Sequence, residues 1–353
     1  MKRMMAVCLS VVLLLVGSGC KETSQFTKYS AYYFDYFDTA TTIIGYTESK
    51  ESFDATCIEI EALLKEYHRL YTIYNRYENY TNLVTVNDVT DGVHQAVQVD
   101  KKIMDLLTFA KEMNQTTNGY VNVAMGSVLK IWHNYRNAGI SDPAEAKLPP
   151  MNKLQEAAQH CSIDDLVLDV EAGTVFLKDP EMRLDVGAIA KGYAVEAIAR
   201  YLMDKGVTGY LLNVGGNVRT IGMAGDKPWN VGIENPDKED EENPYIEFLH
   251  LEGQSLVTSG SYQRYYEVDG VQYHHIIDPA TLMPGTNYRS VSVLTQDSGL
   301  GDAFSTALFL MSYEEGAALV AKTEGVEAMW VMPDGEQRYS DGFKAYTYVP
   351  ETN

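Results

Sequence analysis

One segment in the middle of the chain limits its possible folds more than any other. The run "RLDVG" (183–187) is typical of the end of a buried strand, and "AIAKGYAVEAIARYLMDKG" (188–206) has the apolar spacing of an amphipathic helix. A second apolar strand, "YLLNVGGN" (210–217), follows directly. The segment therefore predicts a helix between two strands, with an acid, a lysine and glycines at the turn where the helix begins.

The glycines of this segment have two explanations. Free backbone N–H groups and the helix dipole would form an anion site at the helix N-terminus, where Lys191 opposes the dipole and a phosphate would explain its presence. The alternative is that the glycines only allow close packing, because their spacing matches neither a dinucleotide fingerprint nor a P-loop. The glycines concerned are Gly187, Gly192, Gly215 and Gly216.

Helical and β-rich stretches alternate along the rest of the chain. Helical spacing of apolar residues occurs at 51–75, 100–113, 189–205 and 302–323. Because "YYEVDGVQYHHI" (265–276) is typical of a hairpin, which needs antiparallel neighbours, we expect an α+β fold with a mixed sheet. The other expected strands are 36–47, 209–214, 217–223, 229–233, 255–260, 289–295 and 327–332.

Asp302 and Thr306 are a candidate metal-binding pair. They are four residues apart on an expected helix, so they project from the same face one turn apart. Oxygen ligands of this kind suit Mg²⁺, which keeps waters and shares substrate phosphates. An N-cap with a buried hydroxyl would show the same pattern.

A pair of adjacent histidines, His274 and His275, precedes the turn "DPATLMPG" (278–285). Successive strand residues point to opposite faces, so only one of the two can face a given cleft. A histidine there can act as an acid, a base or a phosphate contact near neutral pH. Two ordinary sheet residues are the alternative.

The first residues of the chain have the composition of an export signal. Lys2 and Arg3 precede the apolar run "MMAVCLSVVLLLV" (4–16), and small residues end at Cys20. The run is too short to span a bilayer comfortably, and it resembles a bacterial lipoprotein leader, in which the cysteine is acylated. We therefore expect an exported protein, lipid-anchored to the outer face of the cell membrane through Cys20.

The expected organisation is a signal peptide at 1–19, a polar tether at 20–30 and one domain at 31–349. The chain has 28 Lys and Arg against 49 Asp and Glu, a formal net charge of −21. Phosphate backbones would be repelled, so no nucleic-acid partner is expected. Beyond the leader only Cys57 and Cys161 remain, and we expect buried thiols.

The sequences of these segments and their order along the chain resemble those of the ApbE family. Its members are the FAD:protein FMN transferases, which attach FMN covalently to a threonine of a partner protein. "LDVGAIAKGYAVEAIARYL" and "YLLNVGGNVRTIG" are similar to the glycine-rich core of that family. The run "NGYVNVAMGSVLKIW" resembles its "FD-x-T-x-GPL-x-x-LW" stretch, and "WNVGIENP", "VTSGSYQRYYEVDGVQYHHIIDPATLMPG" and "GDAFSTALFLM" follow in the family order. The resemblance covers about residues 34 to 335.

The resemblance implies roles for individual residues. It makes Asp185 and Lys191 contacts to FAD, and His275 a catalytic group near the pyrophosphate. The further cofactor contacts that it implies are Tyr74, Ala124, Met125, Asn213, Gly215, Gly216 and Ile276. The metal would be held by the carbonyl of Ala188 and the side chains of Asp302 and Thr306. The chain departs from the family pattern at Phe37 and Asp38, where "MG" is usual, and at Asn217, where Asp is commoner.

The implied activity is Mg²⁺-dependent transfer of FMN from FAD, a consumed substrate, to a threonine hydroxyl of an acceptor flavoprotein, with AMP released. Lys191 would hold the diphosphate, and His275 or Asp302 would take the threonine proton. The acceptor suggested is a membrane electron-transfer flavoprotein. The implied fold is a mainly antiparallel sheet flanked by helices, with two lobes around an FAD cleft. The alternatives are an FAD pyrophosphatase that yields AMP and FMN, a non-enzymatic flavin-binding lipoprotein, and an adhesive surface lipoprotein.

Overall fold

The computed structural model describes residues 26–88 and 94–350. The expected signal peptide and Cys20 lie outside these ranges. Within them, none of the helices combines the length and apolarity needed to span a bilayer.

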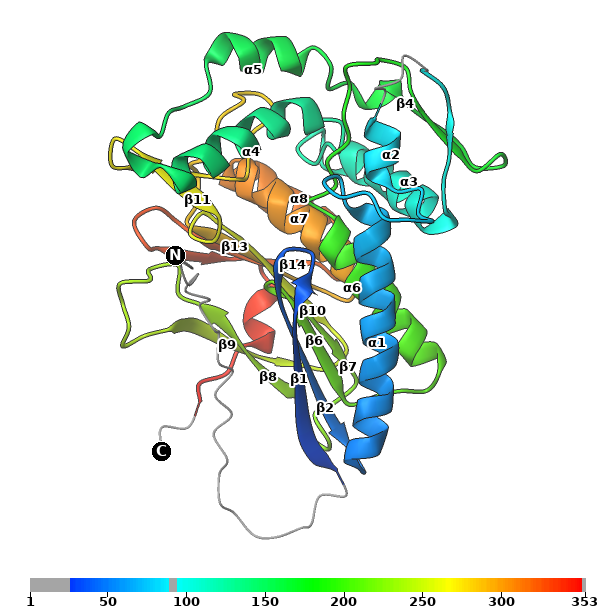
Figure 1. Cartoon of the computed structure of the whole chain (residues 1–353). Helices are drawn as coiled ribbons and strands as arrows, with labels where there is room; N and C mark the ends of the chain where they lie inside the picture. The colour runs from blue at the N-terminus through cyan, green and yellow to red at the C-terminus, as the bar shows by residue number, and fades with distance from the viewer. Residues whose placement is uncertain (1–25, 89–93, 351–353) are drawn as a thin grey trace.

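An eight-stranded sheet is the centre of the fold (Figure 1). All neighbouring strands in it are antiparallel. In sheet order the strands are β1 (Thr27–Tyr36), β2 (Thr39–Thr47), β6 (Tyr210–Val214), β7 (Asn217–Ile221), β10 (Ser255–Gly260), β13 (Ser290–Thr295), β14 (Glu327–Val331) and β15 (Gln337–Tyr339).

The two faces of this sheet are covered differently, because successive strand residues point to opposite sides. Ile43 packs in the core beneath the helices, whereas its neighbour Ile44 packs in a second core on the other face. The helical face carries α1 (Lys50–Tyr71), α6 (Ala190–Asp204), α7 (Ser298–Leu310) and α8 (Tyr313–Lys322). The other face carries the hairpin of β8 (Trp229–Glu234) and β9 (Tyr245–Leu251) and the short helix η3 (Phe343–Tyr346).

Further elements lie at one end of the sheet, above it in Figure 1. Trp132 and Leu154 pack with Tyr266 in a third core, and Trp132 Nε1 donates to the carbonyl of Leu282 at 2.9 Å. The helices here are α2 (Leu83–Asn87), α3 (Lys101–Thr116), α4 (Gly126–Ser141), η1 (Pro143–Glu145), α5 (Met151–Ala158) and η2 (Ile163–Asp165). The strands are β3 (Val97–Gln98), β4 (Leu166–Asp169), β5 (Thr174–Leu177) and the hairpin of β11 (Tyr265–Val268) and β12 (Val271–His274).

The expected α+β architecture with a mainly antiparallel sheet is confirmed, and three boundaries need correction. Residues 183–187 do not form a strand, since only Arg183 makes an isolated bridge, to Met125. Residues 27–30, expected in the tether, belong to β1. The helix expected at 302–323 is two helices, because Ser312 starts α8 with a capping box.

The two remaining cysteines are both free thiols. Cys57 is buried in α1, where burial raises its pKa to about 12. Cys161 is only half-buried, so the expectation of two buried thiols is right for Cys57 alone.

Candidate active site

Asp302, in the second turn of α7, is bound by the first turn of α6. Its Oδ2 accepts a hydrogen bond of 2.8 Å from the N–H of Gly192. Lys191 Nζ lies 3.2 Å from Oδ1 and 3.4 Å from Oδ2. Asp302 is only 4% exposed, so these charge-assisted contacts are what allow a carboxylate to lie there. The fold thus brings together two of the residues expected in the site.

The contact with Asp302 leaves a backbone carbonyl free for another ligand. In a regular α-helix the N–H of Gly192 would donate to the carbonyl of Ala188. It donates to Asp302 instead, and within residues 26–88 and 94–350 the Ala188 carbonyl accepts no backbone hydrogen bond. The sequence signal for this was Gly192 itself, since a Cβ there would lie 2.5 Å from Asp302 Cβ.

Thr306 is the third residue expected to bind the metal. It is half-buried one turn after Asp302 on α7, and its hydroxyl makes no hydrogen bond in the part of the chain that the structure describes. A carboxylate, a carbonyl and a hydroxyl fit a hard cation that also binds waters and substrate phosphates. Among the described residues no group of three or more His, Cys, Asp or Glu side chains is placed to hold a metal.

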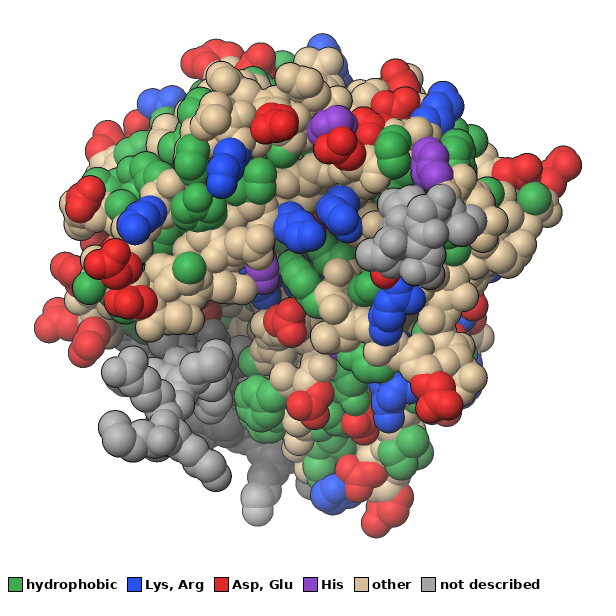
Figure 2. Space-filling view, turned by 45° about the horizontal axis from the view of Figure 1, so that its top comes forward, with side chains coloured by type: hydrophobic (Ala, Val, Ile, Leu, Met, Phe, Trp, Pro, Cys, Tyr) green, Lys and Arg blue, Asp and Glu red, His purple; other side chains and the backbone are tan. Residues whose placement is uncertain are grey.

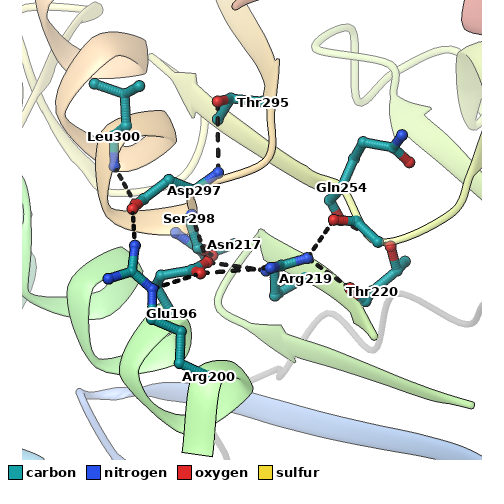
Figure 3. Close-up of polar contacts among 11 residues, drawn as sticks. Glu196, Arg200, Asn217, Arg219, Thr220, Gln254, Thr295, Asp297, Ser298 and Leu300 are labelled. Atoms are coloured by element: carbon teal, nitrogen blue, oxygen red, sulfur yellow. Dashed lines mark hydrogen bonds and ion pairs between the residues drawn. The ribbon is translucent and has the colours of Figure 1, made fainter. Parts of the chain in front are cut away.

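A second carboxylate also joins these two helices, but it lies on α6 and binds the N-terminus of α7 (Figure 3). Glu196 of α6 is buried, and its Oε2 accepts from the N–H of Ser298, the first residue of α7, at 2.9 Å. Oε2 also accepts from Arg219 Nε at 2.9 Å, and Oε1 accepts from Arg200 Nε at 3.1 Å. Each helix therefore uses a carboxylate to bind an N-terminal N–H of the other, which fixes the position of Asp302 relative to Lys191.

The two histidines have different environments, as the strand alternation predicts. His274 is buried with both ring nitrogens bonded, Nε2 to the Gly285 carbonyl at 2.7 Å and Nδ1 to the Ile276 N–H at 3.2 Å. His275 Nδ1 is buried and has no partner within the described chain. Burial, reinforced by Arg264 and other nearby cations, holds the pKa of His275 well below its ordinary value of 6.5. His275 is therefore neutral near pH 7.

Two arginines that the sequence reasoning missed belong to the same neighbourhood. Arg264 and Arg136 both lower the pKa of His275, after burial, and neither guanidinium forms an ion pair within the described residues. Arg264 Nη2 donates to the Asp38 carbonyl at 3.3 Å. On the face drawn in Figure 2, Lys and Arg side chains lie at the edge of a hollow that contains a histidine. In a chain of net charge −21, such a cluster favours an anionic ligand.

Tyr74 provides an aromatic surface near these cations. Tyr74 as a whole is 54% exposed, and its ring stacks on His133 with 5.1 Å between the ring centroids. His133 is also contacted by Arg136, whose Nη2 lies 3.0 Å from His133 Nδ1. Burial and the nearby Asp185 raise the pKa of Tyr74 to about 12, so the phenol stays protonated. An exposed ring on a fixed support can stack on a flavin or an adenine.

Asp185 lies where the segments 122–125 and 183–187 run side by side. Its N–H donates to the Val123 carbonyl at 2.8 Å, and its Oδ1 accepts from the Gly187 N–H at 2.9 Å. Burial raises the pKa of Asp185, while the Gly187 hydrogen bond and the nearby cations oppose this. Ala124 and Met125 are buried, and their N–H groups donate to Asn122 at 2.9 and 3.2 Å.

The expectation that the glycines offer free N–H groups is wrong. Gly215 and Gly216 form the β6–β7 turn with φ of 58° and 85°, and their N–H groups bond to the Ala40 carbonyl and to Asn213 Oδ1. The N–H groups of Gly187 and Gly192 are also taken. Close packing accounts for Gly215, where a Cβ would lie 2.3 Å from Thr39 Oγ1. Ile276 is buried, and its N–H is bonded to His274.

This chain is similar to known proteins over most of its length. Residues 37–330 match the ApbE family. A Klebsiella pneumoniae protein named FAD:protein FMN transferase is 34% identical over 298 residues, which cover 79% of this chain and 88% of that protein. A Treponema pallidum protein of the same name is 35% identical over 261 residues, 70% of each chain. The crystal structure of the ApbE protein of Thermotoga maritima is similar with a TM-score of 0.79 and 27% identity, covering 92% of this chain and 100% of that one.

Proposed function

This chain belongs to the ApbE family, and from that premise we propose that it transfers FMN from FAD to a threonine hydroxyl of an acceptor protein and releases AMP. Family membership makes it a transferase, and two similar proteins are named FAD:protein FMN transferase. The observation that carries the proposal is the free Ala188 carbonyl together with the Lys191–Asp302 pair, in a region where Lys191, Arg136 and Arg264 all act on His275. This combination suits a dinucleotide with two negative phosphates.

The diphosphate is bound by Arg136, Arg264 and Lys191, and the two arginines lack a carboxylate partner within the described residues. Lys191 reaches the same region. The Ala188 carbonyl, Asp302 and Thr306 would hold Mg²⁺, which supplies neutralisation of phosphate charge when bound. Tyr74 gives a ring for the flavin or the adenine.

His275 is the better of the two candidate bases. Burial lowers the pKa of His275, so its ring is unprotonated near pH 7. Asp302 already accepts hydrogen bonds from Gly192 and Lys191. In the reaction, the threonine oxygen forms a bond to the phosphorus on the FMN side, and the bond from that phosphorus to the AMP oxygen breaks. The threonine proton passes to His275, and AMP leaves with the electron pair.

We also propose that the protein is exported and anchored to the outer face of the cell membrane through lipidated Cys20. The support is the leader-like sequence before Cys20. The acceptor would then be a membrane electron-transfer flavoprotein on the same side. Globomycin treatment of expressing bacteria, which blocks processing of lipoprotein leaders, should cause the unprocessed chain to accumulate. Unchanged processing would contradict the anchor.

The transfer is tested by mixing the protein with FAD, Mg²⁺ and a threonine-containing acceptor protein and measuring the acceptor mass. We expect an increase by one FMN and an equal amount of AMP. Asp302→Ala should abolish both, whereas Glu314→Ala, an exposed acid on α8, should leave them unchanged. Release of AMP and free FMN would indicate a pyrophosphatase, and retention of FAD without AMP would indicate a binding protein.

A further inference from the structure

The Lys191–Asp302 pair occupies the oxygen that a metal would need. Gly192 already binds Asp302 Oδ2 at 2.8 Å, so Oδ1 is the oxygen left for a cation. The ammonium of Lys191 lies 3.2 Å from that oxygen. An ammonium and a divalent ion repel each other, so a lysine this close to Oδ1 weakens the binding of a metal there.

We propose that Lys191 competes with Mg²⁺ for Asp302 in the free protein, and that it moves from Asp302 to the FAD diphosphate as the metal binds. This inference rests on the proposed function. Its consequence is coupling: FAD offers Lys191 another anionic partner, so FAD strengthens Mg²⁺ binding. By thermodynamic linkage Mg²⁺ then strengthens FAD binding by the same factor.

The surroundings of Lys191 allow this movement. The Lys191 side chain is 22% exposed, against 6% for that of Asp302, and it has a flexible four-carbon stem. Within the described residues its ammonium has Asp302 as its single hydrogen-bonded partner. Lys191 also contributes to the lowered pKa of His275, after burial and other cations, so its charge already acts in the region assigned to the diphosphate.

The buried pair of Arg219 and Glu196, joining the same helix to β7, shows the contrast. Besides Glu196, the Arg219 guanidinium donates to the carbonyls of Thr220 and Gly253, which hold it in place. Lys191 has no such second anchor in the described chain. Lys191 also stands in the first turn of α6, where the helix dipole disfavours a cation. Of these two ion pairs, the one between Lys191 and Asp302 is therefore the one that a ligand can replace.

Calorimetric titration of Mg²⁺ into the FAD-free protein tests the competition directly. Lys191→Met removes the charge and keeps the length, and it should tighten Mg²⁺ binding about tenfold, an effect typical of one close charge contact. Lys191→Arg keeps the charge and should bind Mg²⁺ as weakly as the wild type. Arg264→Met is the matched control, because it removes a nearby cation that does not contact Asp302.

Adding FAD to the wild type should tighten Mg²⁺ binding, and the gain should be smaller in Lys191→Met. Asp302→Ala should abolish tight Mg²⁺ binding in every background. This result would show that the measured binding occurs at Asp302. Thermal melting checks that each variant is folded, and Lys191→Gln replaces Lys191→Met if that variant is not.

Equal or weaker Mg²⁺ binding by Lys191→Met would overturn the competition, and so would an equal gain in Arg264→Met, which would indicate a general charge effect. If these results came with normal Mg²⁺-dependent FMN transfer by the wild type, this inference alone would fail. If no variant bound Mg²⁺ with or without FAD and transfer needed no metal, the metal part of the proposed function would fail as well.

Discussion

The N–H of Gly192 donates to Asp302 Oδ2 across 2.8 Å, and this contact sets how closely α6 and α7 approach. A side chain at this position has no space. A Cβ on Gly192 would lie 2.2 Å from the Ser298 carbonyl oxygen and 2.5 Å from Asp302 Cβ. The glycine therefore serves the site by its small size, and the carboxylate reaches the backbone of α6 only because no side chain intervenes.

We expect Gly192→Ala to separate the two helices. Overpacking of this kind lowers the free energy of unfolding by about 1–3 kcal/mol. The variant should also lose Mg²⁺ affinity and FMN transfer, because Asp302 would no longer reach the Gly192 N–H. Urea unfolding and Mg²⁺ titration measure the two effects. Gly316→Ala in α8 is the control, because the nearest atom to its Cβ would be Leu308 Cδ2 at 3.2 Å, the end of a flexible side chain. Equal effects in both variants would contradict the argument.

Glu196→Gln tests the other half of the α6–α7 junction. Glu196 and Arg219 are 6% and 4% exposed, and the substitution leaves the buried Arg219 guanidinium without a counter-charge. Removing one partner of a buried pair costs about 3–5 kcal/mol. Arg200→Ala removes the exposed partner of the same carboxylate and should cost less than about 1 kcal/mol. Chemical unfolding of both variants measures the two changes in the free energy of unfolding. Similar losses would contradict the argument that the buried contact of Glu196 with Arg219 is the more important one.

The periodic parts of the fold were predictable from sequence because local spacing determines them. The helix at α6, the β11–β12 hairpin and the one-turn separation of Asp302 and Thr306 all follow from residue spacing. The same reasoning failed at 183–187, where backbone groups bond to the segment 122–125 and to Asn87 instead of to a strand. Such partners depend on tertiary packing and leave no periodic signal.

The cationic part of the site could not be predicted for a similar reason. Arg136 lies on α4 and Arg264 precedes β11, and packing of these distant segments brings both near His275. Glu196 and Arg200, spaced four apart, have the pattern of an exposed helical ion pair. In the structure Glu196 instead faces inward to Arg219. Spacing identifies such pairs but not which face of the helix is buried.

Tyr74→Ala should weaken FAD binding while leaving the chemical step largely intact. The ring stacks on His133 and is exposed for stacking on one ring of the substrate. Loss of an aromatic contact of about 0.5–1.5 kcal/mol would raise the KM for FAD roughly 2- to 10-fold. Tyr74→Phe keeps the ring and should behave like the wild type. Tyr32→Ala, which removes a similarly exposed ring on β1, is the control; a matching rise in KM there would remove Tyr74 from the site.

The pH dependence of kcat/KM for FAD should report the neutral state of His275. Because burial and Arg264 hold its pKa well below 6.5 in the folded protein, the ring stays able to accept a proton as pH falls through 6.5. We expect the acidic limb of kcat/KM, which reflects the free enzyme, to have its midpoint below pH 6.5.

The same shift determines how His275 affects stability. A depressed folded pKa means that the unfolded chain binds more protons, so the contribution of His275 to the free energy of unfolding is complete above pH 6.5 and is lost as pH falls toward the folded pKa. His275→Gln should remove this acid-dependent loss and slow transfer. His160→Gln is the matched control, because the hydrogen bond that His160 Nδ1 donates to Asp179 raises the pKa of His160 above its ordinary value of 6.5. An acidic limb centred above pH 6.5 that disappears in His160→Gln, and not in His275→Gln, would show that His275 is not the base.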